Sequence, residues 1–441
     1  MTAGGALSGG IVSRIYRNLA KLIGGKAGAG IISLAYMVVA VRVLGPRDYG
    51  ILILVHTFAM TVGGIVEFPG WHAVVRYGAQ AAATGDEARL VRLLRFAALA
   101  EAAGGLCAVL TAAVLAPLIG PRLGWSQTAL DFALPYSLAV LASIRATPAG
   151  YLQLVGRFDL LGGHVLLSPI VRLVGAILVA ALGGGLHWFL VVWLIGALSE
   201  FLAMWALGIM VARQRLAHTR LIGSPRGAVA ENSGIWRFMV AANADATFSD
   251  LAPRLAPLAV GWVLGPAPAA LYAVAQRATA VISQPAQLLG QAAYAELALL
   301  AAGGGRGPAV RHALIRSVGV ASAVAVPALL IIAVAREPLA GLIGGPALRG
   351  AGDVMLLLAF ARAILLVGPP TSSALVALGR PGRSVIANVV CSLALLPLLP
   401  PMLTLWGLSG AGAYAIAQAL AAASLLVWFV WRESGPAGVR P

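Results

Sequence analysis

The sequence has little charge and little of what a soluble protein needs. Charged residues make up 10% of its 441 residues and hydrophobic residues 60%, whereas a soluble domain carries roughly 25% charged residues. The two cysteines, Cys107 and Cys391, both lie within apolar runs, which excludes a disulfide-stabilised secreted scaffold. With a mean hydropathy of +0.91, the chain is expected to be an all-α polytopic membrane protein with no separate soluble domain.

Acidic residues are also scarce: 15 stand against 31 basic residues, for a formal net charge of +16. This excess does not predict nucleic-acid binding, because no loop alternates aromatic and basic residues as a single-strand surface does. With the N-terminus in the cytoplasm, 20 of the basic residues lie on the cytoplasmic side and five on the opposite side. Such an excess is typical of cytoplasmic loops. We therefore expect both termini to be cytoplasmic.

The apolar runs predict about 12 transmembrane helices, since about 20 apolar residues cross the hydrocarbon layer. The first run is too long for a signal peptide and is expected to remain as the first helix. The predicted spans are residues 22–44, 48–71, 96–119, 130–153, 163–185, 187–211, 236–264, 268–294, 314–335, 353–378, 385–406 and 410–431.

Short motifs recur at a spacing of half the chain, each between equivalent predicted helices. Six spans separate the copies, so both halves share one orientation and form a parallel repeat, which is a plan used by transporters. The matching pairs are Val43-Leu44-Gly45-Pro46 with Val263-Leu264-Gly265-Pro266, Gly156-Arg157 with Gly379-Arg380, and Gly185-Leu186 with Gly407-Leu408.

This repeat divides the chain into two predicted six-helix bundles. The N-terminal bundle is expected over residues 1–211 and the C-terminal bundle over 236–432. A basic cytoplasmic linker over 212–235 joins them, and a cytoplasmic tail follows over 433–441. Because one chain holds both bundles, a monomer is sufficient.

Five basic residues lie deep within predicted spans, where each charge costs a few kcal/mol and indicates a functional role. Arg172 lies about 13 Å into its helix and Arg277 about 10 Å into its own. A sixth, Lys26, is one turn into the first span, where its side chain can reach the headgroups. Arginine binds phosphate through a planar fork of donors, so we expect these residues to line a basic central cavity. The candidate substrate-binding residues are Arg172, Arg277, Arg145, Arg254 and Arg362.

Deep acidic residues are candidates for proton or sodium coupling, because burial favours the protonated form of a carboxyl group. Asp245 is the first choice, since it has no basic residue one turn away. Asp250 lies four residues before Arg254, so these two could form a structural ion pair or act in transport. Glu200 is the third candidate, and Glu67 and Glu101 are expected at the interface.

Metal and nucleotide sites are not expected. His56, His164 and His187 lie on three different helices with no cysteine or carboxylate at ligand spacing, so no metal site is predicted. A phosphate-binding loop of the ATPase type is also lacking. We expect no cofactor and no catalytic residues.

The junction after the first span resembles a known family. Residues 42–50, Arg-Val-Leu-Gly-Pro-Arg-Asp-Tyr-Gly, are similar to the R-x-L-G-P-x-x-Y-G junction of bacterial oligosaccharide flippases, and residues 264–277 resemble the corresponding second-half junction. These flippases are the Wzx-like polysaccharide-export branch of the multidrug/oligosaccharidyl-lipid/polysaccharide (MOP) superfamily. One departure is Glu67-Phe68-Pro69-Gly70, where many relatives carry a D-x-G end to the second helix.

The resemblance implies a transporter of the bacterial inner membrane rather than an enzyme. It implies movement of undecaprenyl-diphosphate-linked oligosaccharide between leaflets for envelope or extracellular polysaccharide. Membrane lipids, a polysaccharide polymerase and export proteins would be its partners. Two alternatives stay open: a cation-coupled multidrug exporter of the same superfamily, and a membrane glycosyltransferase or glycan polymerase.

Overall fold

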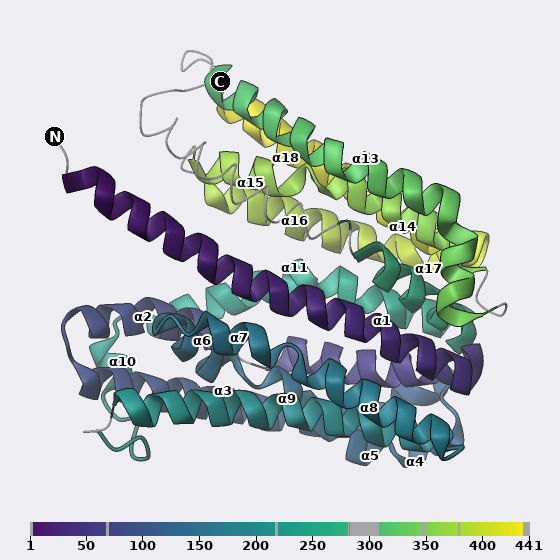
Figure 1. Ribbon diagram of the computed structural model, residues 1–441, viewed down its shortest axis with the longest axis horizontal. Helices are drawn as coiled ribbons and strands as arrows, with labels where there is room; N and C mark the ends of the chain where they lie inside the picture. Colours follow the sequence, from purple (N-terminus) through teal and green to yellow (C-terminus); the bar gives the residue numbers. More distant parts are fainter. Residues whose placement is uncertain are drawn as a thin grey trace. The chain divides into compact units, whose positions relative to one another are not determined.

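A computed structural model describes residues 3–67, 70–216, 219–280, 282, 308–345, 350–377 and 380–434. Within these ranges all regular secondary structure is helical (Figure 1). Eight helices of the described part are long and apolar enough to cross a membrane. The chain is therefore an all-α polytopic membrane protein, as the composition predicts.

The chain separates into two compact units, residues 1–44 with 55–247 and residues 45–54 with 248–441. The predicted limits of the two bundles stay a prediction. The helices up to the end of the first unit are α1 (Ala3–Val66), α2 (Trp71–Ala83), α3 (Glu87–Ile119), η1 (Gly120–Leu123), α4 (Gln127–Asp131), α5 (Ala133–Tyr136), η2 (Ser137–Ser143), α6 (Ala146–Leu154), α7 (Phe158–His164), α8 (Leu167–Ala181), α9 (Leu186–Arg215), α10 (Ala228–Glu231) and α11 (Ile235–Leu264), which continues into the second unit.

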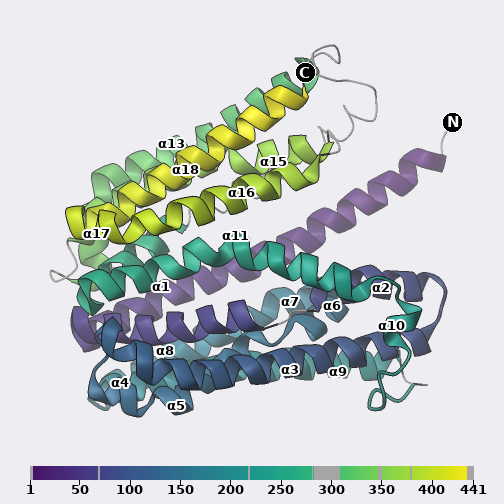
Figure 2. The ribbon, with the colours of Figure 1, turned by 180° about the vertical axis from the view of Figure 1, so that it is seen from behind.

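The second unit packs α14 and α16 against α18, with α13 beside α14. Figure 2 shows α16 running alongside α18. Residues 266–280 form a further helix after α11. The remaining elements are α13 (Pro308–Gly344), α14 (Ala351–Leu365), α15 (Gly368–Ala377), α16 (Pro381–Leu395), η4 (Leu396–Leu398), α17 (Leu399–Trp406) and α18 (Leu408–Glu433).

Gly45 divides α1 into the first two predicted spans. Its φ of 70° is non-helical, and Pro46 follows it. Gly265 breaks the chain in the same way, with a φ of 91°. Glycine adopts positive φ without the steric cost that other residues incur. The two Leu-Gly-Pro motifs are therefore equivalent sharp turns between membrane helices.

The spans predicted over 130–153 and 353–378 are each broken rather than continuous. The first divides into α4, α5, η2 and α6, and the second into α14 and α15. Pro148 lies just after the first break and Pro370 just after the second, and they are 222 residues apart. Proline has no N–H to donate in a helix interior. The internal repeat thus includes an interrupted helix in each half.

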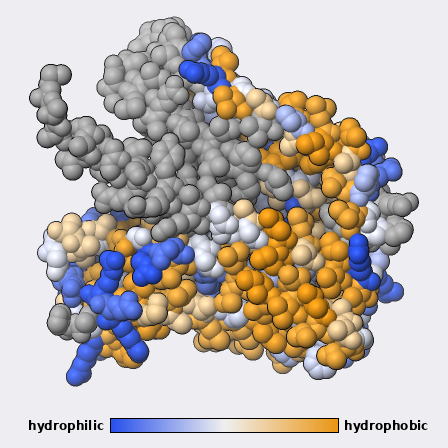
Figure 3. All heavy atoms as spheres, viewed as in Figure 1, coloured by the Kyte–Doolittle hydropathy of each residue, from blue (hydrophilic) through white to orange (hydrophobic). Residues whose placement is uncertain are grey.

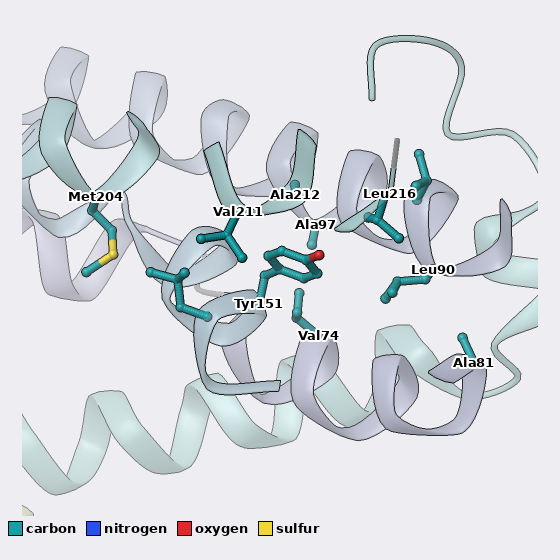
Figure 4. Close-up of a cluster of buried hydrophobic side chains, with 11 residues drawn as sticks. Val74, Ala81, Leu90, Ala97, Tyr151, Met204, Val211, Ala212 and Leu216 are labelled. Atoms are coloured by element: carbon teal, nitrogen blue, oxygen red, sulfur yellow. The ribbon is translucent and has the colours of Figure 1, made fainter. Parts of the chain in front are cut away.

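Residues predicted as the loop after the second span include a helix, α2, which packs on α3 and α6. Tyr151 of α6 lies at the centre of a buried cluster, with Val74 of α2 and Val211 of α9 around its ring (Figure 4). All three side chains are nearly inaccessible. This cluster packs α6 against α2 and α9, directly after the break in its predicted span.

Three arginines of α3 bind the segment predicted to be the linker between the bundles. Arg89 donates to the side-chain oxygen of Asn232 at 2.9 Å, and Arg92 pairs with Glu231 at 2.8 Å. Arg95 donates to four backbone carbonyls between residues 220 and 224. The described part of this segment is therefore attached to the first unit.

Large apolar side chains are exposed on α8 and α9, among them Leu178 at 57% and Leu202 at 63%. On the face shown in Figure 3, hydrophobic residues cover the front of the first unit and hydrophilic residues gather near its end. Extended apolar surface of this kind is unusual on a soluble monomer. It fits helices whose outer faces contact lipid.

Candidate functional site

The break before α6 is stabilised by Glu101 of α3. Ile144 and Arg145 leave the helical region, with ψ of 74° and 10°. The backbone N–H groups of Ala146 and Thr147 both donate to the Glu101 carboxylate, the second at 2.7 Å. The Glu101 side chain is fully buried among the helices. Within a membrane these N–H groups have no water to bind, and Glu101 satisfies both.

Arg145 forms an ion pair with Glu200 of α9 beside this break. The sequence assigned the first to cargo and the second to ion coupling, and the structure brings them together. His164 of α7 contacts the backbone carbonyl of Glu200 through Nε2 at 2.7 Å. Because a carbonyl only accepts, this ring nitrogen must donate. Trp205 adds a bond from its indole N–H to the carbonyl of Ile144 at 2.8 Å.

Arg172 of α8 lies in a second polar site, beside two aromatic rings that pack against each other. Its guanidinium carbon is 5.4 Å from the Trp193 ring centre and 6.0 Å from that of Tyr36. Its Nη2 contacts Nε2 of His56 at 3.1 Å. Its Nε is buried and has no hydrogen-bond partner among the described residues. Arg172 therefore keeps donor capacity toward a further group.

His56 links Arg172 to Tyr136 of α5. Its Nδ1 lies 2.9 Å from the Tyr136 hydroxyl, and the two rings meet edge to face. A guanidinium has donors and no acceptor, so Nε2 of His56 must accept from Arg172. The imidazole is then neutral, with its proton on Nδ1 and donated to the tyrosine oxygen. A neutral histidine therefore holds one side of the arginine.

The two polar sites share the facing surfaces of α8 and α9. Ser168 and Arg172 are one turn apart on α8, and Gly196 and Glu200 are one turn apart on α9. A Cβ on Gly196 would lie 3.1 Å from Cγ of Arg172. Residues four apart lie on one helix face. The absence of a side chain at Gly196 makes room for the arginine.

The second unit holds a smaller polar group around Arg362. Its Nη2 donates to the backbone carbonyl of Gln276 at 3.3 Å. The side-chain amide of Gln276 donates to the buried hydroxyl of Tyr272 at 3.3 Å. Arg277, the next residue, is exposed. Arg362 therefore contacts the residue that precedes Arg277, whereas the Arg277 side chain itself is exposed.

Three predicted site residues lie on α11. Arg254 is half-buried. The side chains of Asp245 and Asp250 lie outside the described residues, so their roles in ion coupling stay predictions. The pairing of Asp250 with Arg254 likewise stays a prediction.

Sequence reasoning missed His56, Tyr136 and Glu101 as parts of these sites. The sequence around His56 indicates no metal site, since no ligand lies at the right spacing. Its partner Arg172 is 116 residues away, and no local pattern links them. The available signal was a histidine and a deep arginine on two predicted spans of one bundle.

Comparisons with known proteins agree with the fold. No family model matches the chain. It is 24% identical to the inner membrane protein YghQ of Escherichia coli K12 over 252 residues, which is 57% of this chain and 71% of that protein. An inward-facing multidrug resistance MATE family transporter of the MOP superfamily matches with a TM-score of 0.71 and 15% identity, over 92% of this chain and 94% of that one.

A second structural match is a point mutant of the Vibrio cholerae MATE transporter VcmN. Its TM-score is 0.64 at 15% identity, over 96% of this chain and 97% of that chain. Both matches span nearly the whole chain. This chain therefore shares the overall fold of these transporters.

Proposed function

We propose that this protein moves undecaprenyl-diphosphate-linked oligosaccharide from the inner to the outer leaflet of a bacterial inner membrane. The cargo would serve envelope or extracellular polysaccharide, and both termini would be cytoplasmic. Movement would occur by alternating access, without a cofactor.

The observation that carries this proposal is the state of Arg172. It lies within the apolar span 158–181, where a lone charge is costly. Its guanidinium lies beside two aromatic rings and contacts a neutral histidine. Its Nε–H has no hydrogen-bond partner among the described residues. A diphosphate offers acceptor oxygens and negative charge to such a guanidinium.

Arg277, Arg145, Arg254 and Arg362 belong to the same proposal as cargo residues. For Arg145 to bind the cargo, its ion pair with Glu200 would have to break. Asp245, Asp250 and Glu200 are proposed for ion coupling. A polymerase and export proteins would act on the cargo after its release.

Multidrug export is the second candidate, because the matching solved structures include MATE transporters. A cation exporter needs acids and aromatic rings at its binding site. Drug susceptibility of a strain lacking this gene tests that candidate directly.

The experiment for the leading proposal uses cells that lack this gene. Completed lipid-linked oligosaccharide and extracellular polysaccharide are quantified together. We expect the lipid-linked form to accumulate while exported polysaccharide disappears. Normal levels of both, together with increased drug susceptibility, would overturn the flippase proposal in favour of multidrug export.

Complementing these cells with single variants tests the role of each residue in export. Arg172→Ala and Arg277→Ala should each fail to restore export at normal protein levels. Arg172→Lys keeps the charge but loses the fork, so we expect partial export. Arg213→Ala, at the exposed end of α9, is the matched control and should restore export fully. Full export by the Arg172→Ala and Arg277→Ala variants would remove these residues from the cargo site.

A further inference from the structure

We propose that His56 is a proton-binding site, and that it takes up a proton when Arg172 turns to the anionic group of the cargo. The cargo half of this proposal rests on the proposed function. The switch itself rests on the contacts among His56, Arg172 and Tyr136.

The first step is the direction of the hydrogen bonds at His56. The partners of its two ring nitrogens have opposite hydrogen-bonding roles. Arg172 can only donate to Nε2, and the Tyr136 oxygen can accept from Nδ1. In this arrangement the ring carries one proton. A second proton would have to sit on Nε2, which the Arg172 N–H already occupies at 3.1 Å.

Protonation and the Arg172 contact therefore exclude each other. An imidazolium N–H would face the guanidinium N–H, donor against donor and positive charge against positive charge. The groups around His56 do not offset this repulsion. Of the described residues, the charged or titratable ones that contact it are Arg172 from α8 and Tyr136 from α5, and no carboxylate contacts either His56 or Arg172.

An anionic group bound to Arg172 reverses this situation. When the guanidinium turns to a phosphate oxygen, Nε2 loses its donor and the local positive charge is neutralised. Nε2 is then free to bind a proton, and the new N–H can donate to the same anion. By linkage, an anion that favours proton uptake is itself bound more tightly at lower pH.

His164 offers a matched control in the same unit. It lies in α7 and contacts the Glu200 carbonyl through Nε2 at 2.7 Å. That nitrogen already donates, so a second proton on the ring leaves the bond intact. The two histidines differ in the role of Nε2, acceptor in His56 and donor in His164. Of these two histidines, His56 therefore has the geometry that such a switch requires.

The first arm of the test needs no cargo. Full-length protein labelled with ¹⁵N-histidine is studied in lipid by solid-state NMR over pH 5 to 8, with His56→Gln to assign the signal. We expect Nε2 of His56 to be unprotonated at pH 7.5, and Arg172→Gln to move its protonation to higher pH. A proton on Nε2 at pH 7.5, or an identical titration in Arg172→Gln, would overturn the switch.

The second arm measures proton uptake on binding of a short-chain polyprenyl diphosphate, by calorimetry in two buffers of different ionisation enthalpy. We expect fractional proton uptake near pH 7, with affinity rising by up to about tenfold per pH unit as the pH falls. His56→Gln keeps an acceptor for Arg172 and should bind with no linked uptake. His312→Gln, at an exposed histidine of α13, should behave as the wild type.

The two arms separate the possible failures. Unchanged proton uptake in His56→Gln would overturn the coupling to the cargo. If the wild type bound no diphosphate while the NMR result held, the proposed cargo would be wrong and the His56 switch would stand. The uncharged polyprenol serves as the ligand control and should bind without taking up a proton.

Discussion

Replacing Glu101 should release the start of α6. Its two carboxylate oxygens accept the N–H groups of Ala146 and Thr147. An unsatisfied buried donor costs about 1–3 kcal/mol, so losing both acceptors in Glu101→Ala should lower the free energy of unfolding by about 2–6 kcal/mol. Glu101→Gln keeps one acceptor oxygen and turns an amide NH₂ toward the other donor. We expect it to lose about half as much, about 1–3 kcal/mol.

Two measurements check this prediction. Unfolding in mixed detergent gives the free-energy change, and hydrogen exchange locates it. Peptides covering α6 should exchange faster in Glu101→Ala, while peptides covering α8 remain unchanged. Leu99→Ala, at a side chain that is 60% exposed two residues away, is the control and should stay within about 0.5 kcal/mol of wild type.

A buried carboxylate also carries a desolvation cost, which acts in the opposite direction. The Gln variant distinguishes the two effects, because it removes the charge and keeps the size of the side chain. If Glu101→Gln were more stable than the wild type, desolvation would outweigh the two hydrogen bonds. The reasoning about the helix break would then be refuted.

Three further predictions concern other contacts. Arg145→Ala and Glu200→Ala should each cost about 1–3 kcal/mol, between exposed and buried pairs, and the charge-swapped double variant should recover part of the loss in thermal stability. Gly50→Ala should cost about 1–3 kcal/mol by overpacking, because its Cβ would overlap the backbone carbonyl of Pro266; Gly30→Ala, which meets nothing within 4 Å, should change the melting temperature little. Arg95→Ala should speed hydrogen exchange in the loop whose four carbonyls it binds, without changing exchange in α9.

Much of the fold could be predicted because apolar runs mark membrane helices directly. Residues 236–264 were predicted as a span, and α11 runs from Ile235 to Leu264. The break in 130–153 could not be predicted in the same way. A run of apolar residues indicates burial in the membrane, but it carries no information on backbone dihedrals. The break depends on Glu101, a partner from another helix.

The candidate sites divide in the same way. Depth along a predicted helix was enough to single out Arg172, because a charge in the hydrocarbon requires a reason. Which group meets it could not be read from spacing, since His56 and Trp193 come from different helices. The pairing of Arg145 with Glu200 is likewise tertiary. Composition thus indicates which residues are unusual, and packing determines which of them act together.

The likeness to MATE transporters does not by itself choose between a cation and an anion as cargo, because one fold can hold either. The partners of three deep charges in the first unit bear on this choice. Glu101 is bound by two N–H groups, and Glu200 is bound by Arg145. Arg172, in contrast, is held by a neutral histidine and retains an unfilled donor. A cation would have to displace the existing partners of Glu101 or Glu200, whereas an anion could accept a hydrogen bond from the Nε–H of Arg172. For these three residues the pairing fits the anionic cargo proposed above, because a diphosphate carries its charge in compact form.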